Sequence, residues 1–259
     1  MNQESLVYGV HAVREFIARH PGRVRQLWAL EGRHDARMEE VLRLAGVAGV
    51  EVLDASREVL DRLAGGGRHQ GLVAHVAAAE ALDEGALADL LDGLDGPPLL
   101  LVLDGVQDPH NLGACLRTAD AAGAHAVVIP KDRAAGLTPA ARKAAAGAAE
   151  TVPLVRVVNL ARCLRSLKAR GLWLVGADEG GSLSLFDAEL AGPLALVLGA
   201  EGSGLRRLTR ETCDLLVNLP MCGAVPSLNV SVAAGILLYQ ALGQRQGTRG
   251  QRPAGTPAP

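Results

Sequence analysis

The amino-acid sequence predicts an α/β protein whose C-terminal part is a mostly parallel sheet covered by helices. Two observations favour this fold class. Short apolar runs rich in Leu, Val and Ala alternate with helical stretches along most of the chain. In addition, three segments in the second half, residues 104–123, 196–221 and 227–238, carry glycine or asparagine between an apolar strand and a helix. Their loops are expected to meet at one edge of the sheet and form a pocket for a small molecule.

Length and composition indicate a globular protein and leave its partners open. The chain has 259 residues, of which 49% are hydrophobic, enough for one large or two smaller domains with real cores. The net charge of −2 and the pI near 6.4 neither support nor exclude an RNA partner. Because only 2% of the residues are aromatic, base stacking cannot be the main mode of RNA recognition.

Cysteine and histidine spacing gives no sign of a metal site. The four cysteines lie far apart with no C-x-x-C pair, so we expect reduced thiols and a cytoplasmic protein rather than a zinc knuckle or a disulfide framework. The seven histidines show no ligand spacing, and we predict no metal. No secretion signal or membrane-spanning run is apparent, so no membrane association is expected.

The first domain is predicted over residues 1–79 as a compact α/β/α unit. Helices are expected near residues 11–19 and 36–45 and after the cap Ser56, with strands at 24–30, 50–53 and 71–76. Residues 80–98 are acidic and rich in alanine, glycine and proline, which indicates a linker with a short helix.

The second domain is predicted over residues 99–244. Strands are expected at 99–103, 126–129, 172–175, 194–198 and 215–219, and one helix begins with Thr138 as cap and Pro139 at its first position. The last helix, residues 227–241, is apolar around almost its whole circumference, so it must be buried in the domain or in a dimer interface. Residues 245–259 are rich in Gly, Arg and Pro and are predicted as a disordered tail.

The first two of the three segments are each ambiguous when taken alone. In the first, Asn111 fits a helix cap with Arg117 a turn and a half inside the helix, which also describes an ordinary capped helix with a solvated arginine. In the second, glycines 199, 202 and 204 let backbone approach a ligand. Their spacing does not match G-x-G-x-x-G, and the surroundings of Ser203 do not match a hydrolase elbow.

The third segment places Ser227 and Asn229 at the entry to the apolar helix, where polar side chains ordinarily act as caps. Together and in this order, the segments resemble the three motifs of the SpoU (TrmH-like) branch of the SPOUT methyltransferases. The matching residues are Asn111-x-Gly113-Ala-x-x-Arg117, Leu198-Gly-Ala-Glu201-Gly and Ser227-Leu-Asn229-Val-Ser-Val-Ala. The first domain, with Tyr8-Gly-Val-His11-Ala and His69-Gln-Gly, is similar to the L30e-like substrate-binding domain of bacterial ribosomal-RNA members.

This resemblance implies a fold, a cofactor and a reaction. It implies a homodimeric enzyme with a deep trefoil knot that uses S-adenosylmethionine to methylate the 2′-oxygen of a guanosine ribose in large-subunit ribosomal RNA. Transfer RNA or another ribosomal site remains the alternative substrate. By the family's pattern, the cofactor is held by main-chain groups around Gly199, Leu219, Met221 and Leu228. The residues implied in catalysis are Arg117, Asn111, Glu201, Ser227 and Asn229.

Two other classes of function remain open. A non-catalytic RNA-binding protein on the same fold is disfavoured because Asn111, Arg117 and Asn229 are all present. A nucleotide-dependent oxidoreductase that uses the loop 199–204 would bind NAD instead. Basic residues available to track RNA phosphates cluster in the first domain and around the pocket loops: Arg14, Arg19, Arg23 and Arg25, then Lys131, Arg133, Arg142, Lys143, Arg206, Arg207 and Arg210.

Overall fold

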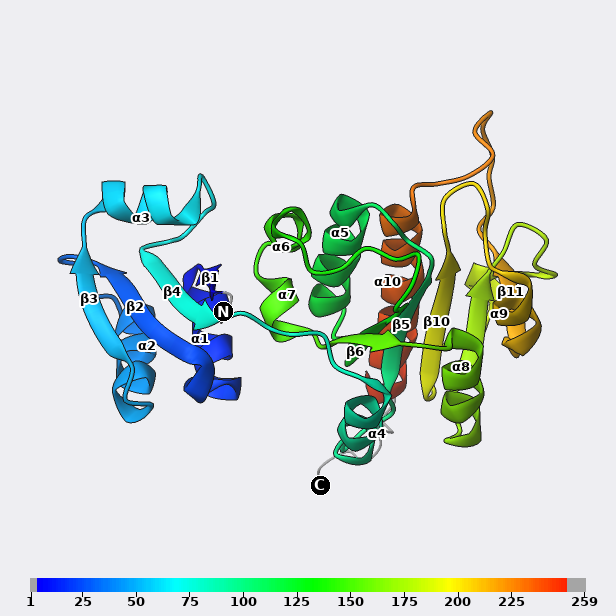
Figure 1. The fold of residues 1–259 in the computed structure, drawn as a ribbon, viewed down its shortest axis with the longest axis horizontal. Coiled ribbons are helices and arrows are strands. Elements are labelled where there is room, and N and C mark those ends of the chain that lie inside the picture. The colour runs from blue at the N-terminus through cyan, green and yellow to red at the C-terminus, as the bar shows by residue number, and fades with distance from the viewer. Residues whose placement is uncertain (1–3, 251–259) are drawn as a thin grey trace, which may run out of the picture. The chain divides into compact units, whose positions relative to one another are not determined.

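The structure, a computed structural model, describes residues 4–250. Its backbone contacts divide the chain into two compact units (Figure 1). The first comprises the residues up to Glu80 together with Ala146–Thr151, and the second comprises Ala81–Ala145 and the residues from Val152 on. Each unit has its own sheet and is described by itself.

The first unit is an α/β/α sandwich around a four-stranded sheet with the order β1-β4-β2-β3. Strand β4 is antiparallel to β1 and β2, whereas β2 and β3 are parallel. Its elements are β1 (Glu4–Tyr8), α1 (Val10–Arg19), the 3-10 turn η1 (Pro21–Arg23), β2 (Val24–Leu30), α2 (Ala36–Val47), β3 (Glu51–Ala55), α3 (Arg57–Ala64) and β4 (Leu72–Ala77), with α7 (Ala148–Thr151) grouped with them.

Helices cover both faces of this sheet, as predicted. Phe16 of α1 and Met38 of α2 pack with Leu27 in one buried cluster, and Leu60 of α3 packs on Val73 in another. The predicted cap Ser56 accepts a hydrogen bond from the Val59 N–H at 3.4 Å. Strand β1 is not among the expected strands. It is a short edge strand whose partner β4 lies more than sixty residues further along the chain, so pairing rather than local pattern defines it.

The second unit has a seven-stranded sheet with the order β7-β6-β5-β10-β8-β11-β9, and all its strand pairs are parallel. This confirms the predicted fold class. Its elements are α4 (Glu84–Asp92), β5 (Leu99–Asp104), α5 (Pro109–Ala121), β6 (Ala126–Pro130), α6 (Pro139–Ala145), β7 (Leu154–Val157), α8 (Leu160–Ala169), β8 (Trp173–Ala177), β9 (Leu183–Ser184), the 3-10 turn η2 (Leu185–Asp187), β10 (Leu194–Gly199), α9 (Arg207–Thr212), β11 (Leu215–Asn218) and α10 (Val230–Gly250).

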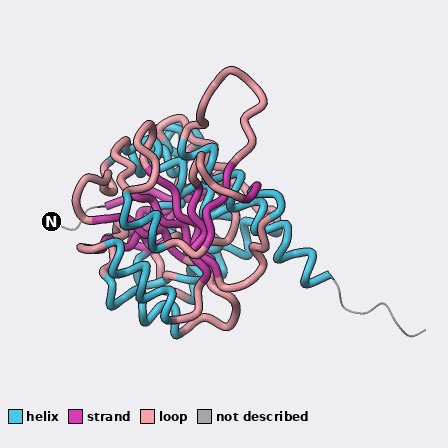
Figure 2. The backbone as a smooth tube through the Cα atoms, turned by 90° about the vertical axis from the view of Figure 1, so that its right-hand side faces the viewer, coloured by secondary structure: helices cyan, strands magenta, loops and turns pink. Residues whose placement is uncertain are grey.

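The five strands predicted for this unit are present, and β7 and β9 are additional. Helices α4 and α8 pack on one face through Leu87 and Leu164, while α5 contacts α6 and α10 (Figure 1). The loop between β11 and α10 projects from the unit (Figure 2). The predicted linker, residues 80–98, contains the expected short helix as α4, and its buried Leu87 packs on the core of this unit.

Helix α10 departs from the prediction at both ends. It begins at Val230 rather than at residue 227, because the Asn229 side chain caps it by accepting the Ser231 N–H at 2.9 Å. It continues to Gly250, so the prediction of a disordered tail is wrong for residues 245–250. The Arg245 side chain stabilises this extension by donating to the Pro98 and Gly192 carbonyl oxygens at 2.7 and 2.6 Å. The rest of the predicted tail, residues 251–259, lies outside the described residues.

The predicted burial of α10 is only partly met within one chain. Leu237 and Leu238 are fully buried, whereas Val232 and Tyr239 are 50% and 52% exposed. Of the two alternatives, burial in the domain therefore accounts for one side of the helix. None of the helices within residues 4–250 combines the length and apolar character that a membrane crossing requires.

Candidate active site

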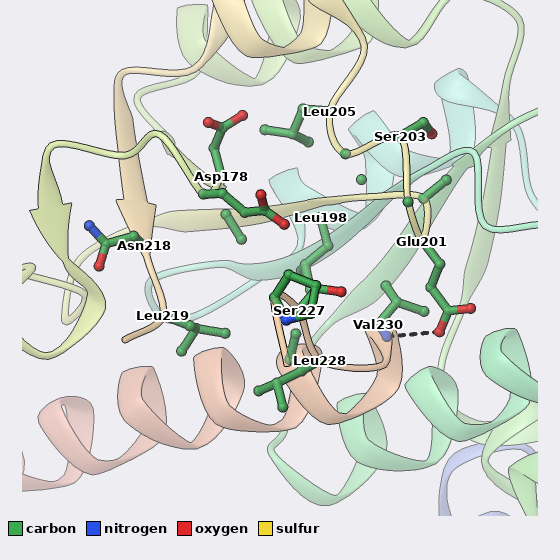
Figure 3. Close-up of a pocket in the computed structure, with 18 of the residues that line it drawn as sticks. Asp178, Leu198, Glu201, Ser203, Leu205, Asn218, Leu219, Ser227, Leu228 and Val230 are labelled. Atoms are coloured by element: carbon green, nitrogen blue, oxygen red, sulfur yellow. Dashed lines mark hydrogen bonds between the residues drawn. The ribbon is translucent and has the colours of Figure 1, made fainter. Parts of the chain in front are cut away.

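A cavity of about 790 Å³ opens at the carboxyl edge of the second unit's sheet. Its walls are the loop after β10, the turn after β8, and the segment that leads from β11 into α10 (Figure 3). Small-molecule sites commonly have volumes of about 300–1,000 Å³ and lie at this edge of parallel sheets. The second and third motif segments therefore meet at one pocket.

The loop Gly199–Leu205 closes back on itself. The Gly204 N–H donates to the Ala200 carbonyl oxygen at 2.9 Å, and Gly202 and Gly204 have positive φ angles of 77° and 62°. A Cβ on Gly199 would lie 2.0 Å from the Gly204 carbonyl carbon. Only glycine fits at position 199, because the loop's own backbone occupies the space of a side chain.

The opposite wall is the turn Asp178–Gly181, which was not predicted as part of the site. The Asp178 carboxylate accepts the Gly180 N–H at 2.9 Å and forms an ion pair with Arg210 at 3.1 Å. The Asn218 amide donates to the Gly181 carbonyl oxygen at 2.7 Å, which ties the turn to the end of β11. The sequence held a usable signal, because Asp-Glu-Gly-Gly directly follows an apolar strand.

The four residues predicted to hold a cofactor all line the cavity: Gly199, Leu219, Met221 and Leu228. Two residues predicted as catalytic, Glu201 and Ser227, line it as well. In Figure 3 the Glu201 carboxylate reaches the start of α10, where the Val230 N–H donates to it at 3.3 Å. Glu201 thus connects the cavity to the first turn of the last helix.

A hydrogen-bond network joins one residue from each motif. The Asn229 Nδ2 donates to Glu201 Oε1 at 2.6 Å and to Asn111 Oδ1 at 3.0 Å. The Asn111 Nδ2 donates to Glu201 Oε1 at 3.3 Å. Asn229 offers two amide hydrogens and Asn111 both donates and accepts, so the two amide groups have complementary roles. Three segments that are distant in sequence therefore converge on one carboxylate.

Asn111 is not the cap of α5, contrary to the sequence prediction. The helix begins at Pro109, and the Asp108 carboxylate is its cap, accepting the His110 N–H at 2.9 Å. Aspartate followed by proline at the first helical position is a favourable start. Because Asp108 satisfies the helix end, the Asn111 amide is available to the network.

The glycine of the first motif serves helix packing. A Cβ on Gly113 would lie 2.4 Å from the Ala141 carbonyl oxygen and 2.6 Å from the Ala144 Cβ, both in α6. Gly113 is buried, and it is not among the cavity-lining residues. Its place in the motif therefore reflects the close approach of α5 and α6.

Arg117 lies outside both the cavity lining and the network. It follows Asn111 by six residues, a rise of about 9 Å along α5. Its side chain is exposed, and within the described part of the chain its guanidinium has no hydrogen-bond or ion-pair partner. The structure therefore brings together Asn111, Glu201 and Asn229. It places Ser227 in the lining of the same cavity as Glu201 and leaves Arg117 exposed.

A buried ion pair that was not predicted supports the glycine loop. The Asp104 side chain, at the end of β5, is 0% exposed. Its carboxylate accepts the Arg206 N–H at 3.1 Å and pairs with the Arg206 guanidinium. Asp104 is also in register with Gly199 across the sheet. It therefore holds both ends of the loop, and removing either partner would leave a costly buried charge or an unsupported loop.

Cys115, four residues after Asn111 on α5, carries a buried thiol. Burial, and secondarily the negative charge of Glu201, raises the pKa of Cys115 to about 12. Because the thiolate is the nucleophilic form, Cys115 is not a nucleophile at neutral pH. Among residues 4–250, no group of three or more His, Cys, Asp or Glu side chains is arranged to hold a metal ion.

The fold and the site define a class of protein, an α/β protein with a small-molecule pocket at the carboxyl edge of a parallel sheet and a polar network beside it. Comparison with known families is more specific. The model of the SpoU rRNA methylase family matches residues 98–239, and the model described as RNA 2′-O ribose methyltransferase substrate binding matches residues 6–82. The chain therefore belongs to the SpoU rRNA methylase family, which confirms the resemblance drawn from the three motifs.

Curated relatives match along nearly the whole chain. It is 54% identical to the 23S rRNA (guanosine-2′-O-)-methyltransferase RlmB of Pseudomonas syringae pv. tomato, over 96% of this chain and 99% of the relative. It is 53% identical to the protein of the same name from Ralstonia nicotianae, over 95% and 98%. Among solved structures, the SpoU methyltransferase AviRb from Streptomyces viridochromogenes in complex with AdoMet superposes with a TM-score of 0.67 and 29% identity, covering 94% of this chain and 91% of AviRb.

Proposed function

We propose that this chain transfers a methyl group from S-adenosylmethionine to the 2′-oxygen of a guanosine ribose in 23S ribosomal RNA. Its family membership and its identity to named RlmB proteins over almost the full length support this reaction. The observation that carries the proposal is the position of Glu201, which lines the cavity and also accepts hydrogen bonds from Asn111 and Asn229. Glu201 therefore belongs both to the small-molecule pocket and to a polar network that is suited to orienting a second substrate.

The residues present fit S-adenosylmethionine. The cavity is large enough, and Gly199, Leu219, Met221 and Leu228 would hold the cofactor along its walls. The Glu179 carboxylate also lines the cavity and suits a cationic ligand, whereas the charge of Asp178 is already paired with Arg210. When bound, the cofactor supplies a methyl group already activated by its attachment to a sulfonium.

Arg117 would assist the ribose as a charge stabiliser. A ribose hydroxyl is a poor nucleophile, so it needs alignment and help in losing its proton. A guanidinium stays protonated at neutral pH, which makes it a better hydrogen-bond donor than base. Arg117 would therefore stabilise the negative charge that develops on the ribose oxygen and position an RNA phosphate, while the proton passes to solvent or phosphate. Its exposed guanidinium, without a partner among the described residues, is available for this role.

The remaining motif residues would position the substrate. Glu201 and Asn111 would orient the ribose, although neither contacts Arg117 within the described residues. Ser227 and Asn229 would hold the loop that faces the RNA. The capping of α10 by Asn229 supports this assignment, since one side chain contributes to both the network and the helix start. The first unit would bind the RNA, in keeping with the match of residues 6–82 to the substrate-binding model.

Assembly and location complete the proposal. A second copy of the chain would cover the exposed Val232 and Tyr239 of α10, giving a homodimer in the cytoplasm with a trefoil knot around the pocket. Light scattering coupled to size exclusion measures the oligomeric state, and a monomer at micromolar concentration would contradict the dimer.

Methyl transfer to defined RNAs tests the function. With radiolabelled S-adenosylmethionine, the chain is expected to label an unmodified 23S rRNA transcript at one guanosine 2′-oxygen. Labelling of a tRNA transcript or of a different rRNA site would support the alternative substrates within the family. Cofactor binding without labelling of any RNA would favour a non-catalytic RNA-binding protein.

Arg117→Lys tests the need for a planar guanidinium. Turnover is expected to fall about 100-fold, because lysine cannot reproduce the two-pronged donor geometry, while calorimetric affinity for S-adenosylmethionine stays unchanged. Arg165→Lys is the matched control, since Arg165 is an exposed arginine on α8. Near wild-type turnover in Arg117→Lys contradicts the assigned role.

A further inference from the structure

Five of the seven basic side chains predicted around the pocket loops fall into two groups. Three are held in ion pairs: Arg206 with Asp104, Arg207 with Glu211 at 2.8 Å, and Arg210 with Asp178 at 3.1 Å. Lys131 and Arg133, in contrast, are exposed, and they have no side-chain partner within the part of the chain that the structure describes. Arg206 and Arg210 serve the fold of the pocket, and Arg207 belongs to an exposed pair on α9. The second group is available to a ligand.

The segment that carries Lys131 and Arg133 follows β6 and packs on the loop before α5. The Ala135 N–H donates to the Val106 carbonyl oxygen at 2.8 Å, which attaches it to the loop before α5. A Cβ on Gly105 would lie 3.8 Å from the Arg133 carbonyl oxygen and 3.8 Å from the Ala200 Cβ. Gly105 therefore lies between the Arg133 main chain and Ala200, the residue that directly precedes Glu201.

Arg133 also has an unusual backbone. Its φ of +56° is one of three positive values at non-glycine positions among the described residues. Such conformations cost free energy and occur preferentially at functional sites. At Gln70, another of the three, the side chain accepts the Val10 N–H at 3.3 Å, which gives that conformation a structural purpose. The exposed Arg133 side chain makes no comparable contact in residues 4–250.

We propose that Lys131 and Arg133 bind a backbone phosphate of the substrate RNA beside the ribose that is methylated. This inference rests on the proposed function, because it assumes an RNA at the Glu201 loop. Charge complementarity favours phosphate, and neither residue lines the cavity, so neither is a cofactor ligand. The Asp108 carboxylate is used in capping α5. Asp132 lies between the two residues in sequence, so residues 131–133 keep a net charge of +1. Arg133 would anchor the strand while Arg117 acts on the reacting nucleotide.

Replacement of Arg133 by residues that tolerate its backbone separates charge from folding. Arg133→Asn and Arg133→Gly both suit a positive φ and remove the guanidinium. In the full-length chain with S-adenosylhomocysteine bound, affinity for an unmodified 23S rRNA transcript is expected to fall about tenfold. The slope of log affinity against log salt should decrease by about 0.7, as for one lost phosphate contact. Affinity for S-adenosylmethionine should not change. Arg165→Asn on α8, with the same charge change, should leave both affinities unchanged.

The outcomes distinguish this inference from the proposed function. If the wild-type chain fails to bind S-adenosylmethionine or to methylate RNA, the proposed function fails first. If the wild-type chain is active and the Arg133 variants bind RNA with unchanged affinity and salt slope, the phosphate contact is overturned. A parallel loss of cofactor affinity in both variants also overturns it, because Arg133 would then support the pocket. If Arg133→Asn does not fold, Arg133→Gly carries the test.

Discussion

Helix α5 and the loop Gly199–Leu205 follow neighbouring strands of one sheet, and each carries a motif glycine for which a side chain has no room. At Gly113 the obstacle is another helix, since an added Cβ would meet the backbone of α6 at Ala141. At Gly199 the obstacle is the loop itself, at Gly204. The same residue type therefore serves tertiary packing in one region and pocket shape in the other. Substitution of Gly199 should lower the affinity for S-adenosylmethionine, whereas substitution of Gly113 should lower the free energy of unfolding.

The largest effect is expected from Gly199→Ala. The new methyl group cannot fit 2.0 Å from the Gly204 carbonyl carbon, so the loop must open. Overpacking of this kind costs about 1–3 kcal/mol, which corresponds to a loss of S-adenosylmethionine affinity of about 5- to 150-fold. Isothermal calorimetry measures it. Gly223→Ala is the matched control, because its Cβ would enter open space. Unchanged affinity in Gly199→Ala would show that the loop shape does not determine binding.

Gly113→Ala should instead lower the stability of the second unit. Alanine favours a helix by about 1 kcal/mol over glycine, but displacing α6 is expected to exceed this gain and leave a net loss of about 1–2 kcal/mol. Urea unfolding measures the loss, and calorimetry should show nearly normal cofactor affinity. Gly235→Ala in α10 is the control, since the new Cβ would lie an ordinary 3.6 Å from the Thr118 methyl group. This substitution should raise the free energy of unfolding. The contrast between the two glycine roles breaks down if Gly113→Ala weakens cofactor binding as much as Gly199→Ala does.

The smallest expected effect is a pH dependence of folding stability that arises from His125, which lies between α5 and β6. The His125 Nδ1 accepts the Leu99 N–H at 2.9 Å, and burial lowers the pKa of His125 below its usual value, with a further contribution from the charge of Arg245. As pH falls through about 6.5, the unfolded chain gains a proton before the folded one, so stability decreases; above that range the effect disappears.

The decrease from His125 should stay below about 1 kcal/mol between pH 7 and pH 5, because the ring is only half-buried. Unfolding curves of the wild type and of His125→Asn at these two pH values measure it, with His110→Asn as the exposed control. The variant should lose this part of the pH dependence while cofactor affinity stays constant. A pH dependence that is identical in wild type and variant would assign the titration to another group.

Local patterns predicted much of the second unit correctly. The cap Thr138 accepts the Ala141 N–H at 3.2 Å as expected, and β10 matches its predicted strand to within one residue. Leu219 and Leu228, which line the cavity, were assigned to the cofactor from the family resemblance. Composition and periodicity alone do not identify such positions. The assignment of Asn111 as a cap was wrong because Asp108 competes for the same helix end, and a local pattern does not rank two candidate caps.

By itself, the sequence determined the order and type of most elements, the three motifs and the family, because caps, apolar periodicity and motif residues act over a few positions. The tertiary structure alone decided which distant groups meet. The Asp104–Arg206 ion pair, the Asp178 turn and the Asn111–Glu201–Asn229 network each join residues that are 28 or more positions apart. Such contacts depend on strand order and register in the folded sheet, which no local stretch of sequence encodes.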